Sequence, residues 1–201
     1  MATCPDGRPL IGRHVRLDLA HDDDAKDLFV ALDHAEVWAS GYSGGPSARP
    51  AEPDGWSARM TAARDDGRVM YVVRLLDDTA PGRLVGTTSL GDTDVVNERT
   101  HIGWTAYSPD MWSTAVNPEC KLLLLTHAFE DCGLGRVKIQ TDLLNTRSQA
   151  AIAKLGAVRE GVLRRHMRRA DGTFRDTVVF SVTIDDWPSV RAGLEARVVK
   201  G

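Results

Sequence analysis

Near the middle of the chain, small and hydrogen-bonding residues separate an apolar run from a helix-like run. The apolar run, His101 to Tyr107, ends at Ser108-Pro109, and the helical pattern begins at Asn117-Pro118. Asparagine is a favoured N-cap, and proline suits the next position because no N–H is missed there. Free main-chain N–H groups and the positive end of a helix dipole attract anions. Residues 113–117 therefore predict a phosphate site, and a capped core helix without a ligand is the alternative.

A second junction of the same kind lies downstream. The run from Val137 to Leu144 reads as a strand, Asn145 is placed to cap the helix that follows, and Ser148 falls in its first turn. Gly156 falls just after the last helical residue, where a left-handed conformation ends many helices. The two junctions predict a strand–helix–strand crossover.

With these motifs the chain resembles the GCN5-related N-acetyltransferases (GNAT), in the branch of RimJ and RimL. The resemblance covers about Gly12 to Trp187 and has one departure, since Ala115 stands where the family's phosphate loop has its central glycine. Alanine tolerates positive φ poorly, so we expect the loop to avoid left-handed geometry; altered coenzyme binding is the alternative. The motifs are Ile102-Gly103-Trp104, the loop from Trp112 to Glu119, Asn145 with Ser148, Ala151-Ile152, Leu155-Gly156-Ala157 and Glu160-Gly161.

The resemblance implies an α/β fold: a mixed, mostly antiparallel sheet of about seven strands with a parallel, splayed central pair, flanked by helices. It implies transfer of an acetyl group from acetyl-CoA to a primary amine by direct attack in a ternary complex. Relatives use small metabolites, antibiotics or protein N-termini as acceptors, and a longer acyl group such as succinyl is an alternative. The loop without glycines also leaves open an acyl-CoA-binding or regulatory module without turnover.

The resemblance further implies which residues hold the coenzyme. The end of the apolar strand would pair with the pantetheine arm, the following loop would hold the pyrophosphate, and Arg147 and Lys154 would meet the 3′-phosphate. Asn145 would position the arm and Ser148 would supply a proton to the departing thiolate. A plain helix cap for Asn145 and a solvated helix face for Arg147 and Lys154 are the alternatives. The coenzyme contacts expected are Ala106, Tyr107, Ser108, Trp112, Ser113, Thr114, Ala115, Val116, Asn117, Asn145, Arg147, Ser148 and Lys154.

The acceptor side offers a candidate base and candidate aromatic walls. An imidazole has an ordinary pKa near 6.5, which suits proton transfer at neutral pH, so His101 is the candidate base. Glu98, Asp142 and a water chain are rivals, and a satisfied strand histidine is the other interpretation. Trp38 and Tyr42, in a stretch rich in glycine and proline, and Trp104 are the expected walls; packing of the first helix is the alternative for the first two.

Composition favours one domain over residues 1–201, with a core of about 11–184 and a final helix over about 186–198. Of the 201 residues, 42% are hydrophobic and 26% are charged, and the formal charge of −3 argues against nucleic-acid binding. No apolar run could span a membrane and no signal sequence is evident, so we expect a cytoplasmic protein; its arginine-rich, lysine-poor composition indicates a bacterium. Metal-ligand spacing is absent, and the three cysteines read as reduced thiols.

The remaining pattern predicts strands that feed the crossover and a hairpin that follows it. The arginine run over 164–169 is typical of a strand with one wet face, and a substrate carboxylate or a homodimer contact could use the same face. The elements expected are strands at Ile11–Leu19, Val69–Leu76, Leu84–Leu90, Val95–Tyr107, Val162–Arg169 and Thr173–Ile184, helices from Asp22 and over Asp54–Arg64, and turns at Asp77–Gly82 and Asp171-Gly172.

Overall fold

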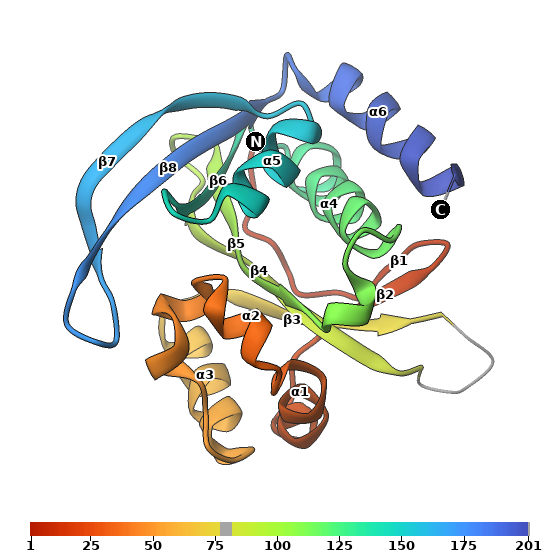
Figure 1. Ribbon diagram of the computed structural model, residues 1–201. Coiled ribbons are helices and arrows are strands. Elements are labelled where there is room, and N and C mark those ends of the chain that lie inside the picture. Colours follow the sequence, from red (N-terminus) through yellow and green to blue (C-terminus); the bar gives the residue numbers. More distant parts are fainter. Residues whose placement is uncertain (77–81, 201) are drawn as a thin grey trace.

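A computed structural model describes residues 1–76 and 82–200. In these residues one sheet has the strand order β1-β2-β3-β4-β5-β6-β8-β7 (Figure 1). The strands are β1 (Leu10–Ile11), β2 (Val15–Leu19), β3 (Val69–Leu75), β4 (Leu84–Asp94), β5 (Arg99–Tyr107), β6 (Arg136–Asp142), β7 (Val158–Arg168) and β8 (Phe174–Thr183). The helices are α1 (Ala25–Leu32), α2 (Ala35–Ala39), α3 (Asp54–Asp65), α4 (Val116–Thr126), α5 (Thr146–Lys154) and α6 (Trp187–Lys200).

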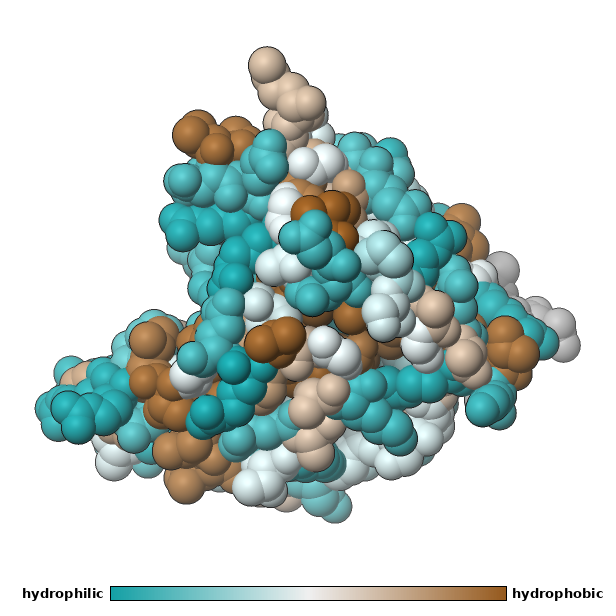
Figure 2. Space-filling model, turned by 90° about the horizontal axis from the view of Figure 1, so that it is seen from above, coloured by the Kyte–Doolittle hydropathy of each residue, from teal (hydrophilic) through white to brown (hydrophobic). Residues whose placement is uncertain are grey.

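Helices cover both faces of the sheet. Helices α1, α2 and α3 lie below it in Figure 1, and α4, α5 and α6 lie above it. Leu28 of α1 and Met60 of α3 are fully buried in the lower cluster of apolar side chains, and Leu124 of α4 is buried in the upper one. Seen from the side of α4, α5 and α6, the surface is mostly hydrophilic and its apolar residues form small groups (Figure 2). The apolar stripes of these helices therefore face the sheet.

The sheet is antiparallel except between β5 and β6. These two strands pair in parallel over four positions, from Arg99 with Arg136 to Ile102 with Ile139. Beyond Ile102, β5 stays paired with β4 and β6 stays paired with β8, so the two strands separate. The expected mixed sheet with a splayed parallel pair is confirmed. The described sheet has eight strands because the short β1 adds to the predicted set.

A β-bulge distorts β5 just beyond the point of separation. Thr87 of β4 pairs with Ala106, whereas Ser89 pairs with Gly103, so Trp104 and Thr105 together lie opposite one residue. Trp104 has a φ of +50°, in the left-handed region that tryptophan rarely adopts. Bulges re-aim side chains and often lie beside functional sites.

Several predicted boundaries differ from the structure. The first helix begins at Ala25, because residues 22–24 form a 3-10 turn in which the Asp24 carboxylate accepts the His21 N–H at 2.9 Å. The strand predicted from Val95 starts at Arg99, since a turn separates it from β4. The expected turn at Asp77–Gly82 falls mostly outside the described residues.

Three features of the described residues bear on other expectations. None of the helices there is long and apolar enough to cross a membrane. Cys4, Cys120 and Cys132 are all free thiols, and the last two are buried. The predicted hairpin around Asp171-Gly172 is present, since β7 and β8 pair antiparallel and Gly172 has a φ of +87°.

Candidate active site

Past the last β5–β6 pair, the end of β5 carries the main-chain groups expected to hold the pantetheine arm. Two of those groups already have partners. The Ser108 N–H donates to the Val85 carbonyl at 2.8 Å, and the Tyr107 carbonyl accepts the Trp112 indole N–H at 3.1 Å. In the Ala106-Tyr107-Ser108 stretch, the Tyr107 carbonyl is therefore bonded to the Trp112 side chain. An N–H group of a ligand could replace the Trp112 indole there.

Asn117 is not the N-cap of α4. The helix begins at Val116, with Ala115 at the N-cap position, so the predicted Asn117-Pro118 cap is wrong. The Val116 N–H bonds to the Thr114 hydroxyl at 3.3 Å, which starts the helix earlier than Asn117 would. Pro118 falls in the first turn all the same, where the helix needs no N–H from it.

The loop before α4 takes a left-handed conformation at Ser113, whose φ is +66°. The expectation that the loop avoids left-handed geometry is therefore wrong for Ser113, although Ala115 itself is right-handed, with a φ of −67°. The turn is held by the Thr114 hydroxyl, which donates to the Met111 carbonyl at 2.8 Å. Among the described residues, nothing accepts the main-chain N–H groups of Ser113, Ala115 and Asn117. These donors precede or begin a helix, which is the arrangement that binds phosphate.

Trp112, in the loop before α4, contacts Arg147, in the first turn of α5. The Arg147 guanidinium carbon lies 3.6 Å from the centre of the Trp112 ring, a cation–π contact. Partial burial lowers the pKa of Arg147. Two residues expected to contact the coenzyme are thus brought together, whereas Lys154 lies exposed in the last turn of α5.

Asn145 caps α5, as predicted. Its side-chain oxygen accepts the Ser148 N–H at 2.9 Å, and its side-chain nitrogen donates to the Ser40 carbonyl at 2.5 Å. One side chain therefore joins α5 to the segment that follows α2. The Ser148 side chain is half-buried, and its hydroxyl forms no hydrogen bond with the described residues.

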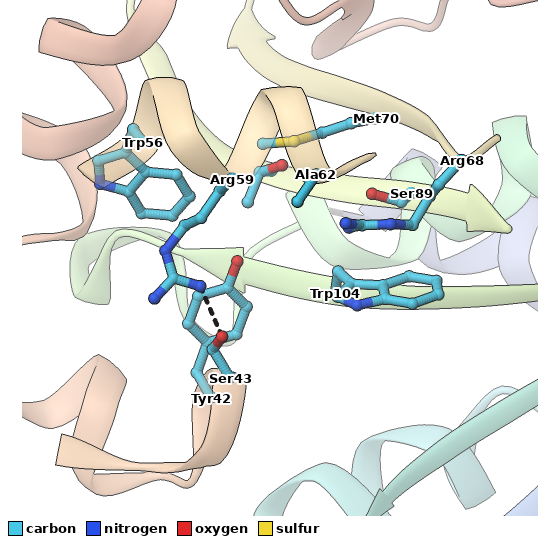
Figure 3. A pocket seen from close by; sticks show the side chains of 10 residues that line it. Tyr42, Ser43, Trp56, Arg59, Ala62, Arg68, Met70, Ser89 and Trp104 are labelled. Carbon is cyan, nitrogen blue, oxygen red and sulfur yellow. Dashed lines mark hydrogen bonds between the residues drawn. The ribbon is translucent and has the colours of Figure 1, made fainter. Parts of the chain in front are cut away.

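On the lower face of the sheet, a cavity of about 150 Å³ lies between α3 and strands β3, β4 and β5 (Figure 3). Tyr42 and Trp104, two of the three predicted aromatic walls, line it. Trp38 does not, because it is 1% exposed and its indole N–H donates to the Leu32 carbonyl at 2.8 Å. It lies behind Tyr42, with the ring centres 5.2 Å apart. The cavity is lined by Tyr42, Ser43, Trp56, Arg59, Ala62, Arg68, Met70, Thr87, Ser89 and Trp104.

Two arginines give this cavity its charge, and the sequence interpretation missed both. The Arg59 guanidinium lies 5.3 Å from the centre of the Trp38 ring, and that of Arg68 lies 4.2 Å from the centre of the Trp104 ring. Burial raises the pKa of Tyr42 to about 12, although both guanidinium groups oppose this shift. Arg59 follows Trp56 at a spacing of one helical turn, which was an available signal. No comparable spacing in the sequence pointed to Arg68.

His101 lies on β5 next to the bulge. One ring nitrogen, Nδ1, is 3.1 Å from the Asp92 carboxylate, and the ring centre is 4.9 Å from that of Trp104. The other, Nε2, is buried without a partner, and a Cβ built on Gly103 would lie 2.7 Å from it. Burial lowers the pKa of His101, while the Asp92 carboxylate opposes the shift. The imidazole is therefore neutral at pH 7 and has an unused nitrogen.

The rival bases are placed differently. The Asp142 carboxylate is buried and forms an ion pair with Arg169 at 2.7 Å. It also accepts the Leu144 N–H at 3.0 Å. Glu98 lies in the turn that opens β5, at the opposite end of the strand from the bulge. The identity of the base stays a prediction.

This architecture is that of a known acetyltransferase family. The sequence model of the acetyltransferase (GNAT) domain matches residues 14–158. The chain therefore belongs to the GNAT family of N-acetyltransferases, and related proteins named for ribosomal N-acetylation support the RimJ and RimL branch.

Three relatives illustrate the similarity. The chain is 30% identical over 106 residues to the Putative ribosomal N-acetyltransferase YdaF of Bacillus subtilis (strain 168). That match spans 53% of this chain and just 57% of that curated relative. A GCN5-related N-acetyltransferase from Brucella melitensis is 25% identical, with 97% of this chain and 87% of that chain covered and a TM-score of 0.85. Mycobacterium smegmatis RimJ in complex with CoA-disulfide shares the fold, with 22% identity, a TM-score of 0.76 and coverage of 96% and 94%.

Proposed function

We propose that the protein transfers an acetyl group from acetyl-CoA to a primary amine by direct attack within a ternary complex. The observation that carries the proposal is the set of free N–H donors just before α4 and in its first turn, which follow the part of β5 that has separated from β6. The cavity on the lower face of the sheet is lined by Trp104 of the same strand. A coenzyme arm paired with the end of β5 and an acceptor in the cavity would meet at the bulge of β5.

The coenzyme side uses the loop and the two crossover helices. The N–H groups of Ser113, Ala115 and Asn117 bind the pyrophosphate, and the helix dipole of α4 adds to their attraction. The arm pairs with the end of β5, where an amide of the arm replaces the Trp112 indole at the Tyr107 carbonyl. Arg147 turns from the Trp112 ring to the 3′-phosphate, because a phosphate attracts a guanidinium more strongly than a ring does.

The reaction requires the acceptor nitrogen to lose two protons and the departing sulfur to gain one. A base removes a proton from the acceptor ammonium, and the free amine attacks the thioester carbonyl, forming the C–N bond. The C–S bond then breaks, the Ser148 hydroxyl donates its proton to the departing thiolate, and the second proton that the acceptor nitrogen loses restores the hydroxyl. His101 is the base that we propose, because it is neutral and has an unused ring nitrogen.

A protein N-terminus is one acceptor class for this chain. Relatives carry names such as ribosomal-protein-serine acetyltransferase and ribosomal-protein-S5-alanine acetyltransferase. A small amine is the other class, and the size of the cavity suits either a small amine or the first residue of a peptide.

Calorimetric titration tests the coenzyme site first. We expect acetyl-CoA to bind, and Arg147→Ala to weaken CoA about 5- to 10-fold while leaving dephospho-CoA, which lacks the 3′-phosphate, unchanged. Lys154→Ala is the matched comparison on the same helix. Thiol release across a panel of amines and N-terminal peptides then tests turnover. Binding without release for every acceptor would favour a regulatory module, and no binding would contradict both functions.

A further inference from the structure

We infer that the cavity beneath α3 binds a carboxylate of the acceptor, so that the acceptor is an amine that also carries an acid group. This inference rests on the proposed function and specifies its substrate class. Arg59 of α3 and Arg68, the residue before β3, both line the cavity. Figure 3 shows the Arg59 guanidinium directed toward Ser43 and that of Arg68 lying over the Trp104 ring. Among the described residues that line the cavity, none is acidic.

The positive charge of Arg68 is buried and has no close anion among the described residues. Its side chain is 9% exposed, and its Nε is buried with no hydrogen-bond partner. Its ion-pair partner, Asp66, is 3.9 Å away and 69% exposed, so that pair is weak. A buried guanidinium without a close carboxylate carries a desolvation cost that a bound anion removes.

Ser89 supplies a second unused donor in the same cavity. It is fully buried on β4, and its hydroxyl has no partner in the described residues. A carboxylate has two oxygens and can accept from a guanidinium and a hydroxyl together. Arg68 and Ser89 thus provide complementary donors for one acid group.

Arg59 closes the cavity from the other side. Its guanidinium donates to the Ser43 hydroxyl and to the Ala48 carbonyl, each at 2.6 Å. Both partners are neutral, so the charge of Arg59 is not cancelled by them. These contacts also fix the segment after α2 against α3, which positions Tyr42 as a wall.

The size and position of the cavity restrict the ligand. A volume of about 150 Å³ accommodates a group the size of benzene. Trp104 lines the cavity from the bulge, just past the last β5–β6 pair, so an acid group held here leaves the amine near the end of β5. The carboxylate can come from a free amino acid or from an acidic first residue of a peptide.

Matched acceptor pairs test the inference and separate these two sources. The first arm compares alanine with alaninamide and phenylalanine with phenylalaninamide; the second compares C-terminally amidated peptides that begin with Glu or Gln. In the arm that holds the true acceptor, we expect kcat/KM to be about 10- to 100-fold higher for the acid. Arg68→Gln should abolish that preference, Arg68→Lys should restore part of it, and Arg191→Gln, an exposed arginine on α6, should leave it unchanged.

A binding measurement keeps the test independent of turnover. In the presence of CoA, butyrate should bind at least 10-fold more tightly than butyramide, and Arg68→Gln should remove the difference. Circular dichroism confirms that each variant is folded. Equal kcat/KM for acids and amides in both arms, or equal binding of butyrate and butyramide, would overturn the inference. Thiol release from no acceptor at all, with butyrate still preferred, would contradict the transferase proposal instead.

Discussion

The carboxylate of Glu119 lies so close to Gly12 that a Cβ built on the glycine would be 2.5 Å from Glu119 Cδ. The same carboxylate accepts the main-chain N–H groups of Arg13, His14 and Val15 at 2.5, 2.7 and 2.9 Å. Glu119 is 2% exposed and is fixed in the first turn of α4. The helix that begins the proposed phosphate site is therefore attached to the turn between β1 and β2.

Glu119→Gln should destabilise the protein by about 2–4 kcal/mol, because the amide replaces one acceptor oxygen with a donor that faces N–H groups. For a chain of this size the expected fall in Tm is roughly 5–15 °C. Thermal unfolding followed by circular dichroism measures the effect, and Glu52→Gln, at an exposed site, is the control. Gly12→Ala should also destabilise; equal Tm values for Glu119→Gln and the control would contradict the attachment.

Lys121→Met should remove a pH dependence of stability. Lys121 is 5% exposed and its ammonium donates only to the Thr105 hydroxyl, at 3.1 Å, among the described residues. Burial lowers its pKa to about 8 from 10.5. The unfolded chain therefore binds more protons between these values, and stability rises with pH across that window. The full cost at pH 7 is on the order of 3 kcal/mol.

Urea unfolding at several pH values measures this contribution as the difference between wild type and Lys121→Met. We expect the variant to be the more stable at pH 7 and the difference to shrink between pH 8 and 10.5. Exposed Lys26→Met is the control, which should show no such trend. A difference that is constant with pH would show that Lys121 titrates normally.

Asn145→Ala and Asn145→Asp separate the two roles of Asn145. Alanine removes the cap of α5 and the bond to Ser40, so the free energy of unfolding should fall by about 1–2 kcal/mol. Aspartate keeps an acceptor for the Ser148 N–H but cannot donate to the Ser40 carbonyl. We expect it to retain most of the stability while hydrogen exchange at residues 40–45 becomes faster. Equal exchange in wild type and Asn145→Asp would show that the bond to Ser40 does not hold this segment.

The pH–rate profile should reveal whether His101 is the base. Because its pKa is lowered from 6.5, the acidic limb of kcat/KM should have its midpoint below pH 6.5. Asp92→Asn removes the carboxylate that opposes the lowering, so the limb should move to still lower pH. His101→Gln should abolish it. An acidic limb that both variants leave in place would assign the base to another group or to water.

The crossover region was readable from the sequence because its signals are local. An apolar run identifies β5, and Asn145 and Gly156 mark the two ends of α5 by side-chain capping and by a left-handed φ of +96°. The predicted start of α4 was wrong because several small polar residues in a row can each begin a helix. The Thr114 hydroxyl accepts the Val116 N–H, so the helix begins before Asn117.

The charge of the cavity beneath α3 was not readable from the sequence, because it depends on the long-range register of the strands. Arg68 meets Trp104 only after β3, β4 and β5 have paired and the bulge has turned the indole toward it. Nothing in the sequence near Trp104 indicates the bulge. The inward position of Trp38 likewise depends on its bond to the Leu32 carbonyl.

The bulge of β5 at Trp104 and Thr105 divides the chain in a way that matters for its evolution. Every residue that lines the cavity beneath α3 lies between Tyr42 and Trp104, whereas the proposed coenzyme contacts lie between Ala106 and Lys154. Under the proposed function, substitutions in the earlier segment would alter which acceptor is chosen without disturbing the donor. Duplicated copies of such a gene would then diverge in specificity while they inherit an unchanged acetyl donor.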